Sequence, residues 1–136
     1  MGADKVLIVD DEEMITDVIS VALEEGGYEV VTSNDSTKAV ELIESESPDV
    51  LISDLKMPEM TGEELIEKAK QISPSLIVIV LTGYASVESA RSVIESGCDE
   101  YLMKPLKDVS LISVAVNRSL KKRRLLERSI IHKRLS

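Results

Sequence analysis

Five short apolar runs stand out along this chain, and longer stretches of mixed character separate them. The first, third and fourth runs are nearly continuous, which is typical of parallel strands that are covered on both faces. The predicted strands are Lys5–Val9, Tyr28–Thr32, Val50–Ser53, Leu76–Leu81 and Cys98–Met103.

The stretches between the strands repeat apolar residues every three or four positions, as one face of an α-helix does. The expected inward residues of the first two helices are Met14, Ile15, Val18, Ile19, Ala22 and Leu23, then Ala39, Val40, Leu42 and Ile43. Thr61 and Ser86 are expected to cap the start of the third and fourth helices, and Gly97 to end the fourth. A fifth helix should begin near Lys107 and Asp108.

Strand and helix patterns alternate five times, which predicts an α/β fold with a doubly wound, five-stranded parallel sheet and right-handed crossovers. The 136 residues suit one domain, and a hydrophobic content of 43% is enough for a packed core. Aromatic residues make up only 2% of the chain, so this core must be aliphatic.

Polar residues follow the ends of four predicted strands: Asp10 and Asp11, Asp54, Thr82, and Lys104. Taken singly, each has an ordinary explanation, such as helix-terminal charge or a turn residue. The carboxyl ends of parallel strands, however, meet at the edge where open α/β sheets bind ligands. Three carboxylates there require a cation, so the pattern predicts a Mg²⁺ site around a nucleophilic Asp54, with a hydroxyl and an ammonium group for phosphoryl oxygens.

Four segments carry a resemblance to a known family: Val9–Glu12, Asp54–Pro58 followed by Gly62, Leu81–Tyr84, and Tyr101–Pro105. Over roughly residues 4–117, the chain resembles the receiver domain of two-component response regulators. This resemblance implies a flavodoxin-like fold with sheet order 2-1-3-4-5. It also implies a cytoplasmic phosphoacceptor switch that promotes its own phosphoryl transfer and dephosphorylation, and is not an enzyme acting on other substrates.

The same resemblance implies a role for each matching residue. Asp54 would accept a phosphoryl group from a phosphohistidine on a sensor histidine kinase. Asp11 and Asp54 would ligate Mg²⁺ directly, Asp10 mostly through water, and Lys56 through its carbonyl group. Lys104 would contact the phosphoryl oxygens, Thr82 would move towards the phosphoryl group, and Tyr101 would rotate inward. The Lys104–Pro105 bond would be cis. Lys56 and Tyr84 would control the access of water to the acyl phosphate.

The same residues disfavour two other functions. Phosphatases of the haloacid dehalogenase type need a general-acid aspartate two positions after the nucleophile, where this chain has Lys56. A flavin binder is disfavoured because the first turn, residues 10–13, is acidic and cannot cradle a phosphate group. A receiver that docks to proteins without being phosphorylated remains the alternative.

Charge divides the chain into two parts, a receiver domain at 1–117 and a basic helical tail or linker at 118–136. The tail has eight basic residues and one acidic residue, which leaves 8 basic and 24 acidic residues, a net −16, in the rest. The overall charge of −9 disfavours nucleic acid as a partner. No apolar run reaches the ~20 residues of a membrane span, and the single cysteine, Cys98, fits a reducing cytoplasm.

The tail lacks glycine and proline, so it is expected to extend the fifth helix towards an output domain or partner. A heptad pattern joins Val109, Ile112, Val116, Leu126 and Ile130, but Ser119, Arg123 and Lys133 interrupt it. The pattern therefore leaves a plain linker helix and a coiled-coil seam both open. We expect a homodimer to which the tail contributes, with folding of the tail back onto the acidic body as the alternative.

Overall fold

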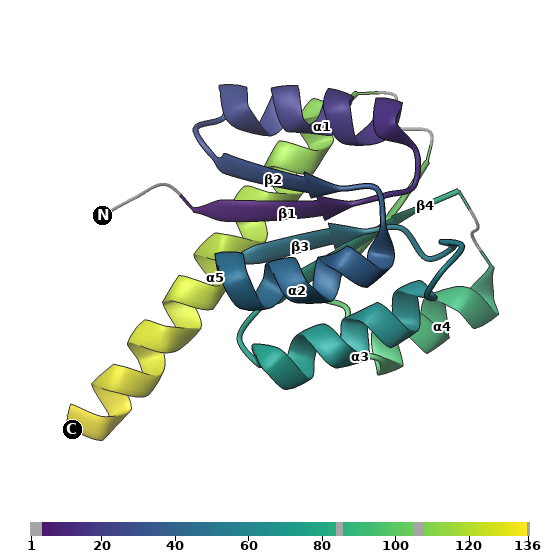
Figure 1. The fold of residues 1–136 in the computed structure, drawn as a ribbon. Coiled ribbons are helices and arrows are strands. Elements are labelled where there is room, and N and C mark those ends of the chain that lie inside the picture. The colour runs from purple at the N-terminus through teal and green to yellow at the C-terminus, as the bar shows by residue number, and fades with distance from the viewer. Residues whose placement is uncertain (1–3, 84–85, 105–107, 136) are drawn as a thin grey trace.

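The computed structural model describes residues 4–83, 86–104 and 108–135, in which strands and helices alternate along the chain (Figure 1). The strands are β1 (Lys5–Val9), β2 (Glu29–Ser33), β3 (Val50–Ser53), β4 (Ile77–Thr82) and β5 (Glu100–Met103). The helices are α1 (Glu13–Glu25), α2 (Ser36–Glu46), α3 (Gly62–Ile72), α4 (Val87–Glu95) and α5 (Ser110–Leu135).

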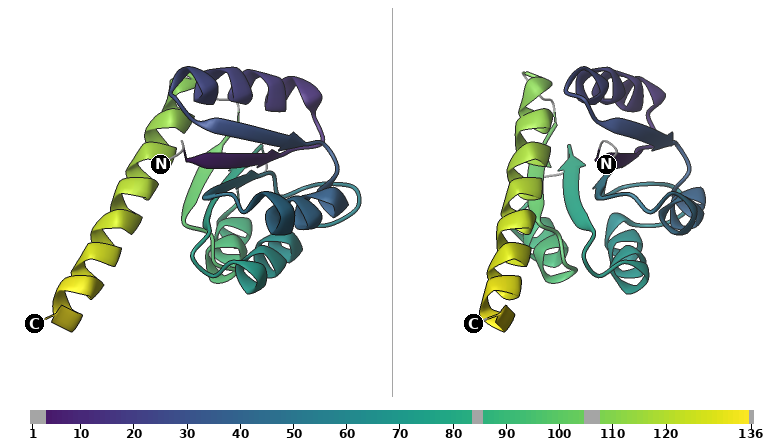
Figure 2. Two further views of the ribbon diagram at one scale, coloured as in Figure 1. Left: turned by 60° about the vertical axis from the view of Figure 1, so that its left-hand side comes forward. Right: turned by 90° about the vertical axis from the view of Figure 1, so that its left-hand side faces the viewer.

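The five strands form one parallel sheet in the order β2-β1-β3-β4-β5, which confirms the predicted fold class. Helices cover both faces of the sheet (Figure 2). Alternate strand residues point to opposite faces, so Val6 and Ile8 pack with α1 and α5, while Leu7 and Val9 pack with α2, α3 and α4. The apolar strand runs are continuous because each strand contributes to two cores.

The strand ends differ slightly from the predicted ones. β2 and β4 each begin and end one residue later than expected, and β5 begins at Glu100 rather than Cys98. Cys98 is not part of the strand because its amide donates to the Val93 carbonyl oxygen at the end of α4. Gly97, just after the C-cap residue Ser96, has φ of +108° and reverses the chain there.

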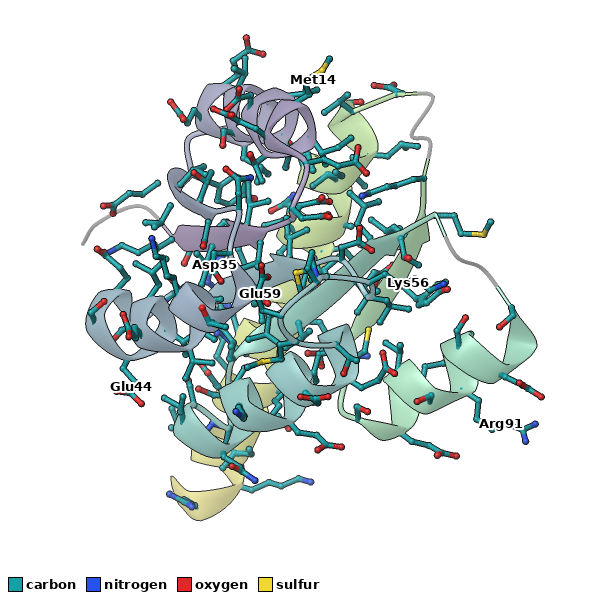
Figure 3. The ribbon with its side chains drawn as sticks, turned by 45° about the vertical axis from the view of Figure 1, so that its right-hand side comes forward. Met14, Asp35, Glu44, Lys56, Glu59 and Arg91 are labelled. Atoms are coloured by element: carbon teal, nitrogen blue, oxygen red, sulfur yellow. The ribbon has the colours of Figure 1, made fainter. Side chains whose placement is uncertain are left out.

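The inward stripe predicted for α1 is partly wrong. The buried residues of this helix are Thr16, Ile19 and Leu23, whereas Met14 is 80% and Val18 50% exposed. Figure 3 shows Met14 on the outer side of the helix, pointing away from the sheet. The apolar residues of α1 cover a wider arc of the helix surface than the sheet contacts, so the residues at one edge of that arc are exposed to solvent. The sequence pattern alone does not show which edge this is.

Helix starts agree well with the predicted caps. The Thr61 hydroxyl accepts a hydrogen bond from the Glu64 amide at 3.2 Å, and the Ser86 hydroxyl accepts one from the Ser89 amide at 3.0 Å. Both bonds satisfy amides that lack partners within the first helical turn. The fifth helix begins at Ser110, whose amide donates to the Asp108 carboxylate at 3.0 Å.

Helix α5 is 26 residues long and runs past the edge of the sheet (Figure 1). Ile112, Val116 and Leu120 lie fully buried in the core that α5 shares with α1. Ile112 and Val116, which belong to the heptad pattern, thus pack against the chain's own sheet and cannot form a seam with another helix. Of that pattern, Leu126 and Ile130 stay exposed.

Basic residues hold the middle of α5 to the end of the sheet opposite Asp54. Arg123 donates to the carbonyl oxygens of Asp49 and Ser75, each at 3.3 Å, and to the Asp49 carboxylate at 3.2 Å. Two further ion pairs join Arg118 to Glu100 and Arg124 to Asp4. Three arginines of the tail therefore contact the acidic body, while α5 continues beyond them as one helix. Within the described ranges, no helix has both the length and the apolar character needed to cross a membrane.

Candidate functional site

The polar residues that follow the strands meet at one edge of the sheet, as the sequence predicts. Asp10 follows β1, Asp54 follows β3 and Lys104 follows β5. The Lys104 ammonium nitrogen lies 2.7 Å from Asp10 Oδ2 and 2.9 Å from Asp54 Oδ2. Asp10 is 2% and Asp54 6% exposed, so one ammonium group bridges two buried carboxylates.

This arrangement leaves an excess of buried negative charge. Burial raises the pKa of Asp10, even though hydrogen bonds from Lys104 and from the Glu12 amide act to lower it. Burial alone would lower the pKa of Lys104, but its bonds to Asp10 and Asp54 outweigh that effect and raise the pKa above 10.5. Lys104 is therefore charged at neutral pH, and the site still lacks positive charge.

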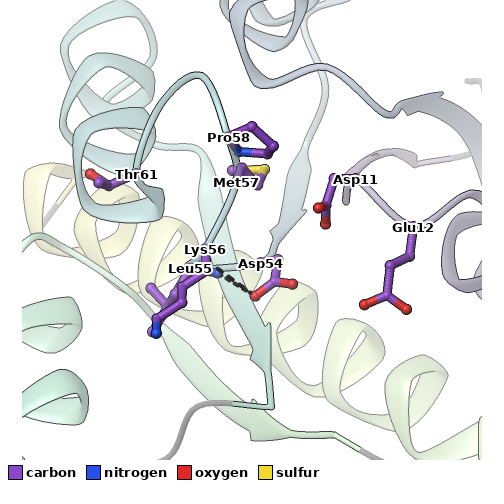
Figure 4. Close-up of a pocket in the computed structure, with 8 residues that line it drawn as sticks. All are labelled: Asp11, Glu12, Asp54, Leu55, Lys56, Met57, Pro58 and Thr61. Atoms are coloured by element: carbon purple, nitrogen blue, oxygen red, sulfur yellow. Dashed lines mark hydrogen bonds between the residues drawn. The ribbon is translucent and has the colours of Figure 1, made fainter.

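Beside Asp54 lies an open hollow of about 460 Å³ (Figure 4). Its lining residues are Asp11, Glu12, Asp54, Leu55, Lys56, Met57, Pro58 and Thr61. Asp54 Oδ1 accepts hydrogen bonds from the amides of Leu55 at 2.6 Å and Lys56 at 3.4 Å, which fix the carboxylate in the wall of the hollow.

The oxygen atoms at this edge suit a hard divalent cation. Carboxylate oxygens of Asp10, Asp11 and Glu12 lie within 4.8 Å of one another, and Asp54 lines the same hollow as Asp11 and Glu12. Mg²⁺ is usually bound by one or two carboxylates together with water molecules. The residues present fit such an ion, and Lys56 lies at the wall where a backbone ligand was expected.

The start of α3 packs closely against Asp54 and Leu55, the residues that follow β3. The Gly62 amide donates to the Leu55 carbonyl oxygen at 2.8 Å. A side chain at Gly62 would meet the Asp54 carbonyl oxygen and the Leu55 Cα at 2.7 Å, closer than such atoms can lie. Glycine at this position therefore allows the start of α3 to pack directly under the residue that follows β3.

Thr82 ends β4 beside this cluster, and Tyr101 lies on β5. Thr82 is buried, and its carbonyl oxygen accepts a hydrogen bond from the Lys104 amide at 2.8 Å. Tyr101 is half-buried and packs against the core beneath α2, α3 and α4. The roles expected of Tyr84 and of a cis bond before Pro105 fall on residues outside the described ranges.

Two polar residues at the site were not assigned a role from the sequence. Glu12 Oε1 lies 4.0 Å from the Lys104 ammonium, and the Asn34 side chain donates to the Asp10 carbonyl oxygen at 2.7 Å. Glu12 directly follows the acidic pair, and Asn34 directly follows β2. The rule that strand ends meet at one edge could have found both.

Known proteins that are similar to this chain show the family to which it belongs. Residues 6–116 match the family model of the response regulator receiver domain. The chain is 33% identical over 118 residues to a cyclic di-GMP phosphodiesterase of Thermotoga maritima, covering 87% of this chain and 31% of that protein. It is 35% identical over 115 residues to the DNA-binding transcriptional regulator NtrC of Escherichia coli K12, covering 82% of this chain and 24% of NtrC.

Solved structures share the fold over most of the chain. A CheY-like receiver domain protein from Methanospirillum hungatei JF-1 is 33% identical with a TM-score of 0.86, and the match covers 90% of this chain and 98% of that one. The chain spans about a third or less of the Thermotoga and Escherichia proteins, so it corresponds to one part of each. The family match over most of its length, the sheet order and the acidic strand-end site together show that this chain belongs to the response regulator receiver domain family.

Proposed function

We propose that Asp54 accepts a phosphoryl group from a phosphohistidine on a sensor histidine kinase, in a reaction that requires Mg²⁺. The observation that supports this most directly is the Asp54 carboxylate, held between Lys104 and the Leu55 amide in the wall of an open hollow. An Asp54 oxygen forms a bond to phosphorus as the bond from phosphorus to the histidine nitrogen breaks. The imidazole keeps the electron pair of the broken bond.

Asp11, Asp54 and the Lys56 carbonyl would hold the cation, with Asp10 acting through water. Bound there, Mg²⁺ would neutralise charge on the phosphoryl oxygens. Asp10, Asp11 and Asp54 carry about −3, and Lys104 with a divalent cation supplies about +3, so the loaded site is balanced before phosphorylation. Phosphorylation replaces the single charge of the Asp54 carboxylate with the nearly two negative charges and three acceptor oxygens of the phosphoryl group, a net gain of about one negative charge. This extra charge and the new acceptor oxygens draw Lys104 and the Thr82 hydroxyl towards the phosphoryl group.

Mg²⁺ is expected to raise the melting temperature of the wild-type chain, and a chelator to reverse the rise. The reason is mass action, because an ion that binds only the folded state stabilises it by about 2.7 kcal/mol at 100 times its dissociation constant. Asp11→Asn should shift this response to higher Mg²⁺ concentration. Differential scanning calorimetry in Mg²⁺ and in EDTA tests this, and equal melting temperatures in the two buffers would exclude the metal site.

Thr82→Ala should leave Asp54 open to phosphorylation but weaken the conformational change that follows. The hydroxyl donates to the product phosphoryl group and is not the nucleophile, so its loss acts after the transfer. Amide exchange of residues 86–103, with and without a beryllofluoride phosphoryl mimic, measures the effect. If the Ala variant changes as fully as wild type, Thr82 is not the relay.

The partners proposed for the switch are a sensor histidine kinase and a downstream output domain or protein. This chain matches a structure of NtrX from Brucella abortus at 26% identity and a TM-score of 0.86, and it covers 29% of that protein. Both NtrX and NtrC are thus far longer than their matched parts, which supports a receiver joined to another module through α5. The cytoplasmic location indicated by the single cysteine stays a prediction.

A homodimer through the end of α5 is the second part of this proposal. Leu125, Leu126, Ile130 and Ile131 are each more than half exposed. Repulsion between two basic tails is smaller than the sequence implies, because Arg118, Arg123 and Arg124 are paired with acidic residues of their own body. A second copy of the chain is the partner that would bring matching apolar side chains to the same place.

The chain is expected to be a dimer whose association weakens when Leu126 and Ile130 are both replaced by Gln. These two residues extend the inward face of α5 beyond the sheet, so their burial against a second copy contributes about 25 cal/mol per Å². Light scattering on both forms measures the change, with Met14→Gln as the control at another exposed apolar site. A wild-type chain that stays monomeric at high concentration and high salt would contradict the dimer.

A further inference from the structure

The side chain of Asn34 joins three segments beside the acidic site. Its amide nitrogen donates to the Asp10 carbonyl oxygen at 2.7 Å and to the Thr16 hydroxyl at 3.2 Å. Thr16 is buried in α1, and its hydroxyl donates to the Glu13 carbonyl oxygen at 2.9 Å. Asn34 therefore connects the end of β2 to the end of β1 and to the first turn of α1.

These contacts orient the backbone from which the acidic ligands project. The Asp10 amide donates to the Ser33 carbonyl oxygen at 3.2 Å, and the Asp10 carboxylate receives the Glu12 amide at 3.0 Å. With its carbonyl oxygen held by Asn34, Asp10 is fixed through the amide, the carbonyl and the side chain. The carbonyl group of Asp10 belongs to the same planar unit as the amide of Asp11, so holding it sets the direction in which Asp11 leaves the strand.

The ordinary explanation for Asn34 is a residue that caps or shapes the turn before α2. That task belongs to its neighbours, however. The Asp35 carboxylate caps α2 by accepting from the Thr37 amide at 2.9 Å, and the Ser33 hydroxyl donates to the Asp35 carbonyl oxygen at 2.8 Å. The Asn34 side chain instead donates hydrogen bonds to Asp10 and Thr16, away from α2.

We infer that Asn34 is a positioning residue for the proposed cation site, because it holds the Asp10–Glu12 loop in the geometry that brings Asp11 beside Asp54. The inference rests on the proposed function. Residues that orient metal ligands without touching the metal typically change metal affinity by about 10–100-fold when replaced. Asn34 acts one step further away, through a backbone carbonyl, so a smaller effect of about three- to tenfold is expected.

The test compares Asn34→Ala with Asp35→Ala, two neighbouring changes that separate positioning from general stability. Mg²⁺ dissociation constants are measured by following amide shifts of the ¹⁵N-labelled chain during titration. Amide exchange of residues 11–13 in EDTA gives a readout that needs no metal. Asn34→Ala should weaken Mg²⁺ binding about three- to tenfold and speed exchange of residues 11–13. Asp35→Ala should lower the melting temperature through loss of the α2 cap and leave both readouts unchanged.

Thr16→Val is the third variant, because it removes one acceptor of the Asn34 amide with little change of shape. It should speed exchange of residues 11–13 less than Asn34→Ala does, since the bond to Asp10 remains. Wild-type Mg²⁺ affinity in Asn34→Ala, or an equal loss of affinity in Asp35→Ala, would overturn the positioning role alone. No Mg²⁺ response in the wild-type chain would overturn the cation site itself, and the inference with it.

Discussion

Asp54→Asn is expected to abolish phosphorylation of the chain by a small acyl phosphate or phosphoramidate donor in the presence of Mg²⁺. A carboxamide cannot supply the anionic oxygen that attacks phosphorus. Asp10 cannot replace it, because this carboxylate is 2% exposed and already accepts hydrogen bonds from Lys104 and from the Glu12 amide. Asp54, in contrast, lines the open hollow where a donor can approach.

Intact-mass analysis of wild type and variant after incubation with the donor measures this result. Asp17→Asn is the matched control, since it makes the same chemical change at an exposed position on α1 and should be phosphorylated like wild type. Undiminished phosphorylation of Asp54→Asn would show that another residue is the acceptor. A wild-type chain that is not phosphorylated at all would favour the alternative of a protein-docking module.

Leu120→Ala is expected to lower the free energy of unfolding by about 2–5 kcal/mol, the range for truncating a buried leucine. Leu120 lies beyond residue 117, the expected end of the receiver domain, yet it is 1% exposed and belongs to the core between the sheet, α1 and α5. The helix is continuous across that boundary. We therefore expect the folded unit to include the residues up to Arg124, which forms an ion pair with Asp4 of the body.

Urea denaturation followed by circular dichroism measures the loss. Leu125→Ala makes the same change five residues further along α5, where the side chain is 64% exposed, and should alter stability by less than about 0.5 kcal/mol. Equal effects of the two variants would mean that the burial of Leu120 contributes nothing to stability. The boundary at residue 117 would then stand as predicted.

Local patterns in the sequence determined the elements of this fold and their order. Continuous apolar runs mark strands that are buried on both faces, and Thr61 and Ser86 mark helix starts because their hydroxyl groups accept amides of the first turn. The acidic and basic residues that follow the strands are visible in the same way. In a parallel sheet, the residues that follow the strands must lie at one edge, so the candidate site could also be predicted from the sequence.

Only the tertiary structure decided which apolar residues of each helix are buried. Met14 and Leu23 fit the same periodic pattern, yet one is exposed and the other buried, because the sheet covers a narrower arc than the apolar one on α1. Ile112 and Ile130 lie on the same face of α5, yet Ile112 is buried and Ile130 is exposed, because α5 runs past the end of the sheet. Burial depends on how far a neighbouring element reaches, and a helical period carries no information about that distance.

Long-range polar contacts were likewise decided by the folded chain. Arg123 appears in the sequence as one of several basic residues that interrupt a heptad pattern. In the structure it binds Asp49 and Ser75 at the starts of β3 and β4. The sequence assigns Asn34 no role, but in the folded chain its side chain donates to the Asp10 carbonyl oxygen in the loop that bears the acidic pair. Such contacts join residues 24 to 74 positions apart, and they exist only because the order of the strands brings distant loops together.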